Sequence, residues 1–184
     1  MPAEIDGASN LYLADGADGD REGFVRAFRE VWHRIPERFR EGMIREWQKG
    51  ITGQPSSPII RLVRGYRYSG GNEAFGHTLI FNADVARLMQ EAGLLPDLIA
   101  HELGHVWHYP VRGAHVANPH ATWNQRECEA DRLATYWGFN MPRLREWADT
   151  HGAEIAEMTG TRHVSWKVDC AEEEKSRPLW ADLA

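Results

Sequence analysis

The sequence predicts an α+β domain in which a small mixed sheet packs against several helices. Apolar residues recur at helical spacing over residues 21–35, 39–50, 96–108 and 122–138. Two short runs, residues 59–63 and 78–81, read as strands, and both precede the most apolar helix. We therefore expect helices packed on a sheet, with a cleft between the sheet edge and the helix at 96–108.

The first half of the chain is divided by glycine and proline. We expect a flexible arm over residues 1–20, which are rich in Gly, Asp and Ala. The helix at 21–35 follows, and Pro36 separates it from a second helix that ends near Gly50. A Gly-rich turn at residues 69–71 separates the two predicted strands.

Capping residues mark the helices of the second half. Asn82 can cap a helix directly after the second strand, and Pro96 suits the first turn of the next helix. This next helix is nearly apolar, so we expect it to be buried on several sides. Thr122 and Gln125 have the spacing of a capping box for a helix that continues to Gly138.

The last predicted helix opens at Pro142 and runs through about Met158. Residues 164–168 have the composition of a short strand. The sequence thus predicts a single domain over residues 21–168 and a C-terminal tail over residues 169–184.

Composition narrows the class of protein. A chain of 184 residues can form one domain with a substantial core, and its net charge of −6 argues against a nucleic-acid partner. Cys128 and Cys170 are too few for a disulfide scaffold. The sequence begins without a secretory signal and contains no apolar run of membrane-spanning length. We therefore expect a soluble, reduced, cytoplasmic protein with no membrane partner.

The most informative segment is His101-Glu102-Leu103-Gly104-His105, in the nearly apolar helix. Residues four apart share one face of a helix, so His101 and His105 can direct their imidazoles to a single metal ion. Glu102 is rotated by roughly 100° from His101 and can lie beside the open position of that ion. Two histidines with a carboxylate as third ligand form a recurrent catalytic zinc set.

Helical phase selects the third ligand on the helix at 122–138. Two residues turn a side chain by roughly 200°, so Glu129 cannot share a face with Glu127 and Asp131, which are four apart. We expect Glu127 to bind the metal and Asp131 to accept the other N–H of a ligating histidine. Ala134 and Gly138 continue this face with little bulk, which predicts a close approach of the two helices.

Alternatives remain beside this assignment. HExxH alone recurs by chance in helices, and His108 is a rival ligand because it lies on the same stripe as His101 and His105. We interpret His108 as a core or cleft-lining residue. The sequence leaves open whether it lines the site, and the same holds for His115 and His120. Cys128 is interpreted as a buried apolar side chain.

The segments HELGH (101–105) and ECEAD (127–131) together resemble the gluzincin zinc peptidases, and among them the minimal gluzincins and ImmA/IrrE-type peptidases. The resemblance implies a zincin-like fold, in which an edge strand above the HExxH helix pairs with an extended substrate; Gly76–Phe81 occupies the matching position. It implies one Zn²⁺ held by His101, His105 and Glu127, with Glu102 as general base.

The sequence therefore favours a zinc-dependent metallopeptidase with a peptide or protein substrate. Two alternatives are a metal-binding regulatory or interaction protein with little catalysis, and a zinc hydrolase of non-peptide substrates. The intact Glu102 counts against the first alternative, because a structural zinc site needs no base and is usually closed by four ligands. The oligomeric state is not predicted.

Overall fold

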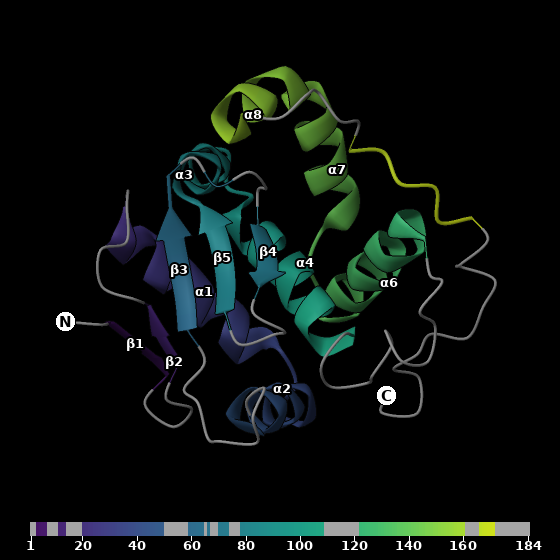
Figure 1. The fold of residues 1–184 in the computed structure, drawn as a ribbon. Helices are drawn as coiled ribbons and strands as arrows, with labels where there is room; N and C mark the ends of the chain where they lie inside the picture. Colours follow the sequence, from purple (N-terminus) through teal and green to yellow (C-terminus); the bar gives the residue numbers. More distant parts are fainter. Residues whose placement is uncertain are drawn as a thin grey trace.

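The computed structural model describes residues 3–6, 11–13, 20–49, 59–64, 66, 70–73, 78–108, 122–160 and 166–171. The described chain has the predicted mixed α+β architecture (Figure 1). Its strands are β1 (Ala3–Asp6), β2 (Leu11–Leu13), β3 (Ile59–Val63), β4 (Gly70–Glu73) and β5 (Thr78–Asn82). Its helices are α1 (Arg21–Arg34), α2 (Glu37–Lys49), α3 (Ala83–Glu91), α4 (Leu95–Val106), α6 (Trp123–Tyr136), α7 (Met141–Thr150) and α8 (Gly152–Thr159).

The described strands form one mixed sheet in the order β1-β2-β3-β5-β4. β3 and β5 are parallel, with Ile60 opposite Leu79, whereas β4 pairs antiparallel with β5 at the edge. The expectation that the strand within Gly76–Phe81 lies at the edge is therefore wrong, because β5 is flanked on both sides. Gly70 and Gly71, which belong to the predicted turn at 69–71, lie instead in the extended strand β4, because β5 supplies its cross-strand partners.

Part of the predicted N-terminal arm also belongs to the sheet. Residues 3–6 and 11–13 pair antiparallel with each other, and Tyr12 of β2 lies opposite Ile59 of β3 in parallel register. Neither strand was predicted, because three or four residues are too few to show a periodicity. The division of the chain into arm, domain and tail stays a prediction.

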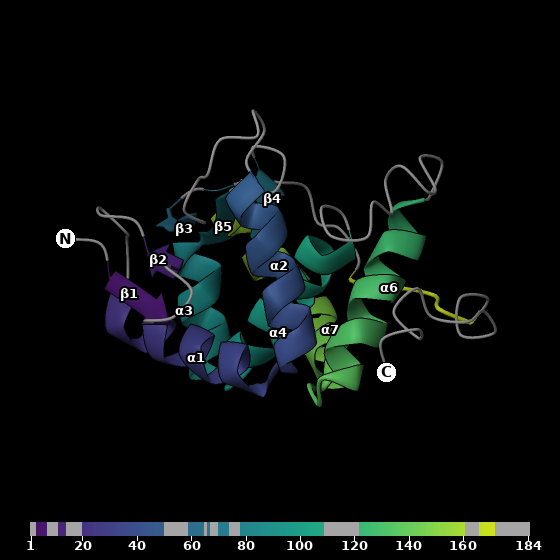
Figure 2. The ribbon, with the colours of Figure 1, turned by 90° about the horizontal axis from the view of Figure 1, so that it is seen from below.

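The helices α1, α3 and α4 lie on one face of the sheet (Figure 2). Large apolar side chains of α1, among them Phe24, Phe28 and Trp32, are buried in the core, and the Phe24 ring lies 5.1 Å from that of Phe81 in β5. α4 contributes Leu98 and Leu103 to the same core, both without exposed surface. The prediction that the HExxH helix is buried is confirmed.

The second half contains confirmed and corrected elements. Thr122 and Gln125 form the predicted capping box at the start of α6. The single helix predicted to run through Met158 is divided at His151 into α7 and α8. Residues 166–168, the described part of the predicted strand at 164–168, have no regular structure. Within the described residues, no helix is both long and apolar enough to cross a bilayer.

Cys128 of α6 is buried, as interpreted from the sequence, but it forms a disulfide with Cys170, so the expectation of reduced cysteines is wrong. The two cysteines lie 42 residues apart, and no local pattern indicates their pairing. Asn124 supports the same contact, since its amide donates to the Asp169 carbonyl at 2.5 Å. Disulfides persist mainly in oxidising compartments, so this pairing counts against the cytoplasmic setting that the sequence predicts.

Candidate metal centre

Helix α4 carries His101 and His105, which lie one helical turn apart. The Nε2 atoms of His101 and His105 lie 3.1 Å apart, and their rings meet edge to face with centroids at 4.6 Å. His101 is buried at 3% exposure. The predicted convergence of the two imidazoles is present in the structure.

Helix α6 lies directly beside α4 (Figure 1). A Cβ placed on Gly104 would stand 2.9 Å from the carbonyl oxygen of Ala130, so the absent side chain permits this close approach. The sequence analysis attributed the approach to Ala134 and Gly138. Gly138 instead has a positive φ of 90° just after α6, where it ends the helix.

The close approach brings Glu127 of α6 to both histidines. Its Oε2 lies 3.3 Å from Nε2 of His101, and its Oε1 lies 3.2 Å from Nε2 of His105. One ligand atom from each of these three residues falls within 4.8 Å of the others. Helical phase therefore predicted which carboxylate of α6 converges with the two histidines. Glu129, the rejected candidate, forms an ion pair with Arg132 at 2.7 Å.

The donor set fits a metal ion with tetrahedral geometry. Zinc takes histidine nitrogens and carboxylate oxygens at about 2.0–2.2 Å, which places neighbouring donors at tetrahedral corners about 3.3 Å apart. The 3.1 Å between the two Nε2 atoms is close to that edge length, and each Nε2 lies at a similar distance, 3.3 or 3.2 Å, from a different oxygen of Glu127. The described residues therefore have the chemistry and spacing of a metal site, although they do not determine the identity of the ion.

Asp131 occupies the predicted supporting position. Nδ1 of His101 donates to Oδ1 of Asp131 at 2.8 Å. This bond places the imidazole proton on Nδ1, so that in the neutral ring the lone pair of Nε2 faces the cluster. Two carboxylates one turn apart on α6 thus have different roles: Glu127 faces the imidazoles, and Asp131 orients His101.

Arg145 of α7 is a member of the site that the sequence analysis missed. Its Nε donates to Oδ2 of Asp131 at 2.8 Å, and its Nη2 donates to Oδ1 of Asp131 at 3.0 Å and to Oε2 of Glu127 at 2.9 Å. An arginine on a polar helix carries no local signal of such a contact. Only the packing of α7 against α6 reveals it.

The charges and hydrogen bonds of Glu127, Asp131 and His101 shift one another's pKa values. Burial favours the neutral form of Glu127, but His101 and His105 outweigh it and hold the pKa of Glu127 well below its usual range. Burial likewise opposes ionisation of Asp131, and hydrogen bonds from His101 and Arg145 lower its pKa overall. Burial and Arg145 disfavour a charged His101, yet Glu127 and Asp131 raise its pKa to about 10. A metal ion would therefore have to displace a proton from this cluster.

Glu102, the predicted general base, is 6% exposed and follows His101 on α4. It is not one of the three residues that converge as ligands. Burial raises the pKa of Glu102, an effect that the charged forms of His101 and His105 oppose. The carboxyl group is thus electrostatically linked to the two histidines while remaining outside the ligand group, as the helical phase predicts.

Of the three other histidines considered as site residues, only His108 lies within the described residues. His108 donates from Nε2 to the carbonyl oxygen of Glu129 at 3.1 Å and does not belong to the ligand group, which agrees with its interpretation as a core residue. His115 and His120 lie outside the described residues.

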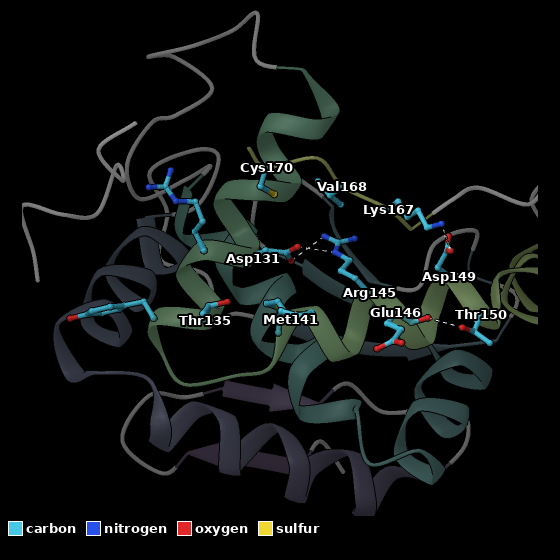
Figure 3. Close-up of a pocket in the computed structure, with 13 residues that line it drawn as sticks. Asp131, Thr135, Met141, Arg145, Glu146, Asp149, Thr150, Lys167, Val168 and Cys170 are labelled. Atoms are coloured by element: carbon cyan, nitrogen blue, oxygen red, sulfur yellow. Dashed lines mark hydrogen bonds and ion pairs between the residues drawn. The ribbon is translucent and has the colours of Figure 1, made fainter. Parts of the chain in front are cut away.

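The described residues also form an open pocket of about 890 Å³ between α6, α7 and the segment 166–170 (Figure 3). Asp131 and Arg145 line this pocket, whereas His101, His105 and Glu127 do not. Because it touches only the supporting side of the cluster, we do not assign it as the substrate cleft. Its rim includes an ion pair between Lys167 and Asp149 at 3.3 Å.

Comparison with known protein families, curated proteins and solved structures finds no match to this chain. The resemblance to gluzincins therefore rests on the two motif segments alone.

Proposed function

We propose that the protein is a zinc-dependent metallopeptidase with a zincin-like arrangement of its site. The observation that carries this proposal is the convergence of His101, His105 and Glu127 from two helices at the spacing of zinc donors. Three protein ligands would leave the fourth position of a zinc ion to water, which is typical of catalytic rather than structural zinc sites.

The roles of the side chains follow from their positions. His101, His105 and Glu127 would hold one Zn²⁺, which when bound supplies a Lewis acid that polarises a carbonyl group and makes water more acidic. Asp131 orients His101 through the bond to Nδ1. Glu102 would accept the proton of the attacking water on a carboxylate oxygen and pass it to the leaving nitrogen.

A peptide substrate is favoured by the sheet edge beside the motif helix. β4 is at one edge of the described sheet and packs against α4. An edge strand presents backbone donors and acceptors to which an extended peptide can pair as an additional strand. This feature supports a peptide rather than a small-molecule substrate.

The test is the variant Glu102→Gln, assayed for metal content and for cleavage of a random peptide library. We expect zinc content to stay at the wild-type level and cleavage to fall by about 10²- to 10⁴-fold, the usual contribution of a general base. Glu91→Gln, at an exposed position paired with Arg87, serves as the matched control. Wild-type cleavage by Glu102→Gln would refute the mechanism. A zinc-loaded wild type that cleaves no peptide would favour the regulatory or non-peptide alternatives.

A further inference from the structure

Both oxygens of Glu127 approach the histidine pair. Oε1 lies 3.2 Å from Nε2 of His105, and Oε2 lies 3.3 Å from Nε2 of His101. A carboxylate in this position can bind an ion through one oxygen or through both. The choice matters because a second oxygen would raise the number of ligands from four, one of them water, to five.

Arg145 distinguishes the two oxygens. Its Nη2 donates to Oε2 at 2.9 Å, whereas Oε1 lies 3.2 Å from Nε2 of His105. A guanidinium–carboxylate bond of this length is charge-assisted and among the stronger hydrogen bonds in proteins. The side chain of Arg145 is only 12% exposed, so water competes weakly for this contact.

The position of Arg145 is itself fixed. Nε and Nη2 grip both oxygens of Asp131 in a planar fork, at 2.8 and 3.0 Å. Asp131 is bonded in turn to Nδ1 of His101 at 2.8 Å. Arg145 and Asp131 thus connect the Glu127 carboxylate to the ring of His101 on α4. These contacts fix the orientation of the carboxylate relative to that ring.

We propose that Arg145 is a positioning residue that restricts Glu127 to one-oxygen metal ligation through Oε1 by engaging Oε2. The proposal rests on the metal centre of the proposed function and deepens it. Arg145 touches no substrate in this account. By acting through Glu127, it would limit the ion to four ligands, one of them water.

The test uses cobalt(II) as the bound metal, because tetrahedral cobalt absorbs visible light more strongly than cobalt with five or six ligands. We compare the full-length wild type with Arg145→Met, which removes the charge and the fork, and Arg145→Lys, which keeps the charge without the fork. Arg143→Met is the matched control on the same helix, since Arg143 bonds only the Ala92 carbonyl among the contacts described for its side chain. Circular dichroism verifies that each variant is folded.

We expect four-coordinate spectra for the wild type and Arg143→Met. Both Arg145 variants should lose visible absorption, and X-ray absorption should show a rise from about four to about five ligands as Glu127 binds through both oxygens. Unchanged spectra in folded Arg145→Lys would overturn the proposal, whether or not Arg145→Met folds. A wild type without cobalt would overturn the metal centre as well. A wild type with the expected cobalt spectrum but without peptidase activity would contradict only the proposed function.

Discussion

The two sides of α4 differ in the side chains that surround them: one side is apolar, and the other carries ionisable groups. Toward α1 and the sheet, the helix joins an apolar core that includes Phe24, Phe28 and Trp32. Toward α6 and α7, it faces a cluster of ionisable side chains, which we call the polar seam: His101, His105, Glu127, Asp131 and Arg145. One twelve-residue helix therefore separates a stabilising core from a group of buried charges.

The difference shows which side serves the fold and which side serves chemistry. Apolar burial is favourable and non-directional, whereas burying charges is costly unless each charge is paired and hydrogen-bonded. The polar seam meets this requirement with a network of hydrogen bonds around Asp131 and Arg145. Ionisable side chains with shifted pKa values occur preferentially at functional sites, so the polar seam is the candidate functional side of α4.

The largest expected effect lies on the apolar side. Phe28 has no exposed surface, so Phe28→Ala should lower the free energy of unfolding by about 3–5 kcal/mol through lost burial and a residual cavity. Urea denaturation measures this loss, and the partly buried neighbour Val25, changed to Ala, is the control. A loss no larger than that of Val25→Ala would show that this core contributes less than its burial indicates.

The disulfide ties the segment that contains Cys170 to α6 at the outer side of the polar seam. Cys170→Ser should lower the free energy of unfolding by about 2–4 kcal/mol, because the cross-link restricts the unfolded chain. Urea denaturation with and without reductant provides the measurement. If reductant leaves the wild-type midpoint unchanged, the bond between Cys128 and Cys170 does not stabilise the fold.

The close approach of α4 and α6 can be disturbed by a single methyl group. In Gly104→Ala the new Cβ would stand 2.9 Å from the Ala130 carbonyl oxygen, so the two helices must separate. We expect a loss of about 1–3 kcal/mol in stability, as for other overpacked sites. Zinc affinity should fall as well, because Glu127 moves away from the histidines. Wild-type zinc affinity in a folded Gly104→Ala would contradict the dependence of the site on this contact.

The smallest predicted change concerns the orienting carboxylate. Asp131→Asn keeps an acceptor for His101 but removes the charge that Arg145 grips. Competition with a chelator should show zinc affinity reduced by about 10- to 100-fold, the usual consequence of changing a partner of a ligating histidine. Asp149→Asn, which removes the partner of Lys167, should leave zinc affinity unchanged. Equal affinities in both variants would show that Asp131 does not tune the metal.

Helical phase, which is local, predicted which side chains share a face on each helix: His101 with His105, and Glu127 with Asp131. That the two faces meet depends on the packing of α4 against α6. Residues four apart share a face whatever the rest of the chain does. The capping box of Thr122 and Gln125 was predictable for the same reason. The helical parts of the fold were therefore accessible from sequence.

The features that escaped prediction depend on contacts between distant segments. β4 is extended only because β5 lies beside it, and Arg145 reaches the polar seam only because α7 packs on α6. The pairing of Cys128 with Cys170 spans 42 residues and has no local signature. Tertiary context, rather than any property of these residues in isolation, determines their roles.

The most direct test of the account is a comparison of zinc binding between Glu127→Gln and Glu129→Gln, by metal analysis and calorimetric titration. The two residues lie on the same helix, but only Glu127 faces His101 and His105. We predict that the wild type and Glu129→Gln bind about one zinc ion per chain and that Glu127→Gln does not retain it. Zinc retention by Glu127→Gln at the wild-type level, or a wild type that binds no zinc, would contradict the central claim.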